Sequence, residues 1–164
     1  MIVDGSAATS SRLSSPNGVE SDGAGGFWIA NSLSNTIVRV DSAGLIRTIV
    51  GLPISYSGCS NGPAYLARFN SPQMAFPDPV SGNDLILDWS CHAVRMLLPN
   101  GTVSAVTWAG VLSSSGSTGN GGPASQGRFT FPAAFALDGA GGGFVAVRLC
   151  TASEGHELVC SVLS

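Results

Sequence analysis

The stretch GPAYLARFNSP, residues 62–72, recurs as GPASQGRFTFP at residues 122–132, 60 residues further along the chain. A shorter copy, RLSSP, occupies residues 12–16 and ends 56 residues before the first stretch does. Three copies at nearly one spacing indicate internal repeats, and repeats of this kind build a fold from successive supersecondary units. The sequence therefore predicts three units, at approximately residues 12–61, 62–121 and 122–164.

Each unit continues after its proline with short apolar stretches separated by turns. The turn DGAGG at residues 22–26 is repeated letter for letter at residues 138–142. Asp-Gly between apolar runs is a hairpin signal, because Gly adopts the backbone angles that such turns need. After the strand that follows the proline, we expect strands at 28–31, 36–40 and 45–50 in the first unit and at 85–88, 93–97 and 102–108 in the second.

Four short antiparallel strands per unit, without helical periodicity, are typical of a β-propeller blade. The predicted fold is all-β, a partial β-propeller of about three four-stranded blades, the last incomplete or degenerate with one strand near 157–163. Propellers have about four to eight blades, so three do not close a ring alone. The chain is either a piece of a larger propeller or completes a ring by self-association; a distorted, self-closed sandwich is the third alternative.

Composition limits the partners. Seven Lys and Arg against ten Asp and Glu give a net charge of −3, which leaves little with which to neutralise phosphates, so a nucleic-acid partner is not expected. No apolar run approaches the ~18 residues of a membrane helix, so no membrane span is expected. The start MIVDGSAATS has no export signal, and the compartment stays open.

The four cysteines, Cys59, Cys91, Cys150 and Cys160, form no CxxC pair and no zinc-type spacing. No metal site and no cofactor are therefore expected. Four cysteines allow three disulfide pairings, and nothing in the sequence selects one. We favour buried or free thiols over disulfides, because small cysteines are common in protein interiors.

Two units resemble the NHL-repeat family of β-propellers. The matching residues are Pro16, Gly18, Val19, Asp22, Trp28, Ile29, Ala30, Asn31, Asn35, Val38 and Val40 in the first unit, and Pro72, Asp78, Leu85, Ile86, Asp88, His92, Val94, Arg95 and Leu97 in the second. Residues 58–72 are also similar to a Gly-rich linker of one subset of that family. The third unit departs from the pattern after Ala146. The resemblance implies a propeller that serves as a scaffold for protein interaction or ligand binding.

Candidate site residues are few: Asn31, Asp88, His92 and Arg95 are placed by the repeat at the rim of a central channel. Asp88 and His92 could pair as a base and its orienting group. We favour a structural role, in which Asp88 accepts turn amides and His92 packs between blades, because the first unit has Asn31 and Asn35 at these positions. No catalytic residue is assigned.

The expected function is a binding scaffold that meets a protein or carbohydrate partner through its long loops, at 51–61 and 110–122. The alternative is a fragment of a six-bladed propeller enzyme, similar to lactonases or lyases, with a metal in the central channel. Arg68-Phe69 and Arg128-Phe129 recur at the start of their units, which predicts a repeated arginine hydrogen bond and an aromatic wedge between blades.

Overall fold

The fold is known from a computed structural model, which describes residues 2–52, 56–78, 82–98, 104–118, 123–137, 143–148 and 158–163. Within these ranges every regular element is a β-strand or a single 3-10 turn, and the strands pair antiparallel. The prediction of an all-β chain is confirmed. The turn at 138–142 lies outside the described residues.

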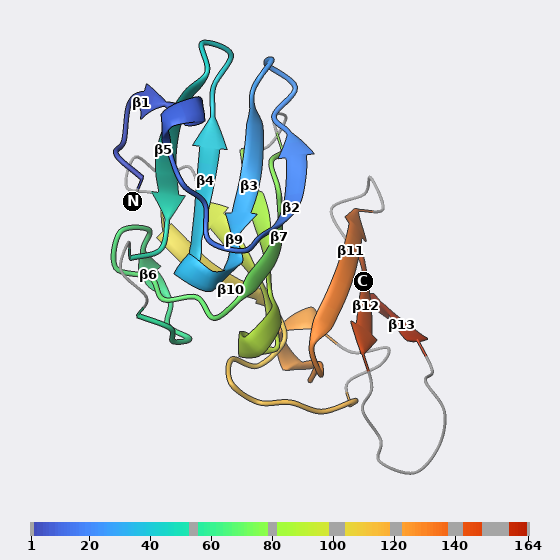
Figure 1. Cartoon of the computed structure of the whole chain (residues 1–164). Coiled ribbons are helices and arrows are strands. Elements are labelled where there is room, and N and C mark those ends of the chain that lie inside the picture. The colour runs from blue at the N-terminus through green and yellow to red at the C-terminus, as the bar shows by residue number, and fades with distance from the viewer. Residues whose placement is uncertain are drawn as a thin grey trace.

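The first sheet is a meander with one short additional strand at its edge (Figure 1). Its order is β1-β5-β4-β3-β2. The strands are β1 (Ser6–Ala7), β2 (Pro16–Ser21), β3 (Phe27–Asn31), β4 (Thr36–Val40) and β5 (Leu45–Val50). Two 3-10 turns, η1 (Ala8–Ser10) and η2 (Ser32–Ser34), lie between them.

The second sheet repeats this plan, in the order β6-β10-β9-β8-β7. Its elements are β6 (Gly62–Pro63), β7 (Pro72–Phe76), β8 (Asp84–Asp88), η3 (Trp89–Cys91), β9 (Ala93–Leu98) and β10 (Ser104–Ala109). The third sheet has the order β11-β12-β13. It consists of β11 (Pro132–Leu137), β12 (Gly143–Arg148) and β13 (Leu158–Leu163), and the turn η4 (Ala124–Gln126) precedes it.

The hairpin between β2 and β3 is fixed by one carboxylate. Asp22 Oδ1 accepts the backbone N–H groups of Ala24 and Gly26, both at 2.8 Å, and Oδ2 accepts the guanidinium of Arg39. The Ala24 hydrogen bond first, and then Arg39, hold the pKa of Asp22 below its usual range. The Asp-Gly pair in the sequence thus corresponds to an Asx-type turn, in which the aspartate side chain accepts backbone N–H groups of the turn.

The hydrophobic core lies between the sheets. Phe69, which is fully buried, packs in one cluster with Trp28 and Ile37 of the first sheet and Ile86 of the second. Phe129 has the same place in a cluster that joins residues of the second and third sheets. The predicted aromatic wedge is therefore present at both junctions. The predicted arginine hydrogen bond also repeats, but it is made by the backbone and not by the guanidinium. Arg68 pairs with Ser60, and Arg128 with Thr118, in isolated β-bridges.

Candidate functional site

Asn31 and Asp88 occupy the same place in successive sheets, at the last residue of β3 and of β8. The register puts Pro16 opposite Asn31 and Pro72 opposite Asp88. Asn31 Oδ1 accepts the backbone N–H of Ser14 at 2.6 Å, and Asp88 Oδ1 accepts that of Asn70 at 2.9 Å. Both side chains therefore hold the segment that leads into the strand next to them, β2 for Asn31 and β7 for Asp88.

Asp88 also forms a buried ion pair. Its Oδ2 lies 3.1 Å from Arg95 Nη1, and both side chains are completely inaccessible to solvent. Burial raises the pKa of Asp88 to about 7, although the Asn70 amide and the Arg95 guanidinium act in the opposite direction. Burial also lowers the pKa of Arg95, against the attraction of Asp88. The desolvation of the two charges therefore outweighs their attraction.

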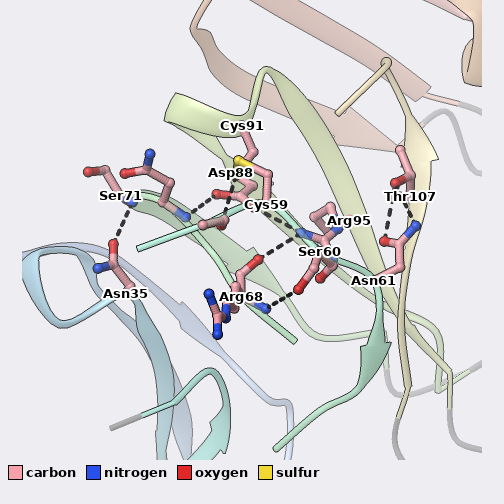
Figure 2. The surroundings of a disulfide bond; sticks show 12 residues. Asn35, Cys59, Ser60, Asn61, Arg68, Ser71, Asp88, Cys91, Arg95 and Thr107 are labelled. Atoms are coloured by element: carbon pink, nitrogen blue, oxygen red, sulfur yellow. Dashed lines mark hydrogen bonds and ion pairs between the residues drawn. A yellow bond between two sulfur atoms is a disulfide. The ribbon is translucent and has the colours of Figure 1, made fainter. Parts of the chain in front are cut away.

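Arg95 fastens the second sheet to the loop that crosses it (Figure 2). Nη2 donates to the carbonyl of Ser60 at 2.7 Å, and Nη1 donates to that of Arg68 at 3.3 Å. The guanidinium lies over the ring of Phe69, 4.7 Å from its centroid. Only Nε has no hydrogen-bond partner among the described residues. Arg95 is thus part of the framework and is closed to a substrate.

His92 does not join this cluster. It follows η3 in a left-handed conformation (φ 57°), and its Nδ1 accepts the backbone N–H of Phe131 at 3.2 Å. Its ring lies 4.8 Å from that of Phe131, which stacks on Trp89. Burial lowers the pKa of His92, which agrees with a neutral ring that accepts at Nδ1. The alternative in which His92 and Asp88 pair as a base and its orienting group is therefore not what the structure has, because the turn of His92 carries it toward Phe131 of the third unit.

A disulfide joins Cys59 to Cys91, with a Cα–Cα distance of 5.5 Å. The expectation of thiols is therefore wrong for these two residues. The bond holds the loop before β6 against η3 (Figure 2). The spacing of the four cysteines in the sequence does not indicate that these two segments lie together. Cys150 lies outside the described residues, and nothing is described of the Cys160 side chain. The bond lies beside Ser60 and fixes the loop against Arg95.

A cavity of about 290 Å³ opens between the N-terminal segment, the end of β5 and the segment that follows β6. It is lined by Ile2, Asp4, Thr48, Ile49, Val50, Gly51 and Tyr65. Tyr65 is 65% exposed, and Asp4, which also lines the cavity, accepts the backbone N–H of Thr48 at Oδ1 at 2.8 Å. The sequence does not predict this cavity, because most of its lining residues belong to segments without a motif. Only Gly51, at the start of the long loop 51–61, lies in a segment that was expected to bind.

Within the described ranges, no group of three or more His, Cys, Asp or Glu side chains lies together in a way that could hold a metal ion. No helix in the same ranges is long and apolar enough to cross a membrane.

No protein-family profile and no curated protein matches the chain. Solved structures do match. A protein of unknown function from Bacteroides thetaiotaomicron superposes with a TM-score of 0.61 at 18% identity, over 73% of this chain and 29% of that one. Auxiliary nutrient binding proteins from B. thetaiotaomicron and Bacteroides ovatus superpose with TM-scores of 0.59 and 0.55, at 20% and 22% identity.

These matches show a shared fold. The superposition covers 74% of this chain for the B. thetaiotaomicron nutrient binding protein and 73% for that of B. ovatus. It covers 32% of each of those two chains. The chain therefore spans about a third of the length of the solved structures that it matches.

Proposed function

We propose that the chain forms three consecutive blades of an NHL-type β-propeller that binds a partner and has no catalytic activity of its own. The partner class is a protein or a carbohydrate, and the binding surface is formed by the loops between the blades. The junctions between the sheets support the propeller, and the chemistry of the buried residues supports binding over catalysis.

One repeated contact carries the proposal. Asn35 and His92 have matching left-handed conformations, with φ of 56° and 57°. Asn35 Oδ1 accepts the backbone N–H of Ser71 at 2.8 Å, and His92 Nδ1 accepts that of Phe131 at 3.2 Å. The same link thus joins the first sheet to the second and the second to the third. Repeating one junction repeats one rotation, and a repeated rotation of small sheets builds a propeller.

The residues that could perform acid–base chemistry are already engaged. Asp88 is buried against Arg95, and His92 uses Nδ1 to hold the next sheet. A general base must reach the proton it removes, directly or through one water. Asp88 is fully buried and has no such access, and His92 Nδ1 is already engaged with Phe131, which favours a binding role over the enzyme alternative.

The cavity beside Tyr65 favours a small ligand over a flat protein surface. Its volume of about 290 Å³ lies near the lower end of ligand-binding sites, which run from about 300 to 1,000 Å³. The exposed Tyr65 ring offers a stacking surface, and Asp4 Oδ2, whose partner oxygen Oδ1 accepts the Thr48 amide, offers a hydrogen-bond acceptor in the same cavity. These groups suit a small carbohydrate. The nutrient binding names of two matched structures agree with such a role.

Calorimetric titration with a panel of mono- and disaccharides tests the proposal. We expect a sugar of the panel to bind the wild type, and Tyr65→Ala to weaken that binding at least tenfold. Val3→Ala is the matched control, since Val3 is 63% exposed and does not line the cavity. Equal binding by the two variants, or no binding of any sugar, would contradict a carbohydrate site at this cavity.

A further inference from the structure

The three sheets allow each position to be compared in three environments. Val19, Ala75 and Phe135 occupy one position, because the register pairs them with Ile29, Ile86 and Val145 respectively. Ala75 is 2% and Phe135 7% exposed, because each packs against the preceding sheet, whereas Val19 is 61% exposed. The first sheet therefore leaves bare the position that its two successors cover.

Neighbouring positions on that face agree. Pro16 is exposed, whereas Pro72 and Pro132 at the equivalent position are buried. Leu13, which corresponds to the wedge residue Phe69, is only half-buried. Ile2, Ala8 and Leu13 pack against Val38, Val40 and Ile46, so the bare part is limited to β2 itself. We call this part, formed by Pro16 and Val19, the head face.

The third sheet shows the opposite deficit. Trp28, Leu85 and Phe144 occupy one position, the second residue of β3, β8 and β12. Trp28 is 7% and Leu85 4% exposed, because each lies in the core between its sheet and the next, whereas Phe144 is 43% exposed. Ala134 and Ala136 pair with Ala146 and Phe144, lie on the same face and are exposed. We call the face formed by Ala134, Ala136 and Phe144 the tail face.

We propose that the tail face of one copy of this chain packs on the head face of a second copy. The molecule itself shows what covers such faces. At the first internal junction Trp28 packs in one cluster with Ala75, and at the second Leu85 packs in one cluster with Phe135. Head and tail are different surfaces, so the contact is heterologous, and such contacts form closed rings when the rotation closes. The three sheets of the described residues in two copies number six, within the range of about four to eight blades. The inference rests on the stacking in the proposed function.

The head face is already in the conformation that receives a neighbour. Ser71 and Phe131, which donate their N–H groups to the preceding sheet, have φ of 54° and 50°. Ser15 precedes its proline in the same way and has φ of 46°. A left-handed conformation is unfavourable for residues other than Gly. That Ser15 keeps it indicates that the first sheet is built like the two that have a sheet before them.

Light scattering after size-exclusion chromatography tests the inference. The wild type should elute with twice the 16.5 kDa mass of one chain, and Val19→Asp and Phe144→Asp should each elute as monomers, because each places a charge in every contact of the ring. Leu66→Asp is the control: Leu66 is 53% exposed, but it belongs to the middle unit and to neither face. It should leave the dimer unchanged.

Mixing the two monomeric variants tests the direction of packing. In the mixture, the normal tail of the Val19→Asp copy can pack on the normal head of the Phe144→Asp copy. A head-to-tail contact therefore predicts that dimers reappear on mixing, with one normal junction. Failure to reappear, although the wild type dimerises, would overturn the head-to-tail geometry.

A wild-type monomer with a cooperative thermal melt would overturn self-association. Self-association through these two faces would also be overturned if the wild type is a dimer and neither Val19→Asp nor Phe144→Asp changes its mass. The stacking itself is tested separately by the stability of Phe69→Ala, which acts inside one chain. If Phe69→Ala melts like the wild type, the stacking in the proposed function fails; if only self-association fails, that stacking stands.

Discussion

Removing the disulfide between Cys59 and Cys91 should lower the stability of the chain by a predictable amount. The two cysteines are 32 residues apart. Closing a loop of that length in the unfolded chain stabilises the fold by about 3.7 kcal/mol in the chain-entropy treatment. In a protein of this size, ~1 kcal/mol corresponds to roughly 2–4 °C in melting temperature. The double variant Cys59→Ala/Cys91→Ala should therefore melt about 7–15 °C below the wild type.

The assay is a calorimetric melt of both proteins, with and without a phosphine reductant. Reduction should lower the melting temperature of the wild type to that of the double variant. The reduced double variant is the control, because it isolates any effect of Cys150 and Cys160. If the variant melts within ~2 °C of the oxidised wild type, the bond contributes less than about 1 kcal/mol, and the reasoning from loop length is refuted.

Three further predictions concern single residues. Phe69→Ala should cost about 3–5 kcal/mol in urea unfolding, and Leu13→Ala at the equivalent, half-buried position clearly less; equal losses would contradict the wedge. Gly110→Ala should destabilise far more than Gly44→Ala: both have positive φ, but a Cβ at 110 would lie 2.7 Å from a backbone oxygen, whereas Gly44 has open space. The free energy of unfolding should fall as the pH rises from about 4 to about 7, since the pKa of Asp88 rises from 3.8 to about 7 on folding. Urea unfolding at each pH measures this slope, and Asp88→Asn should flatten it. An unchanged slope in the variant would count against the role of Asp88.

The strands could be predicted from sequence because the repeat aligns them. The expected strands at 36–40 and 45–50 coincide with β4 and β5, and that at 93–97 ends one residue before β9 does. The alternation of apolar and polar residues, bounded by Gly turns, is a local signal that survives in each unit. The edge strands β1 and β6 were not predicted, because two residues carry no periodicity.

The site could be predicted only in part. Asp88 and Arg95 meet because they sit on adjacent antiparallel strands, a relation that the repeat indicates. His92 leaves them because η3 and a left-handed residue turn it toward Phe131, and no pattern in the letters marks that rotation. The disulfide depends on where a long loop lands, which is a tertiary relation between segments without regular structure.

The short strands β1 and β6 affect how the molecule meets other chains. Each lies along the outer strand of its sheet, β5 and β10 respectively, and β6 ends in Pro63, which has no N–H to offer. An open edge of free amides and carbonyls would recruit foreign strands and lead toward aggregation. With β5 and β10 covered in this way, strand addition is discouraged along these two strands.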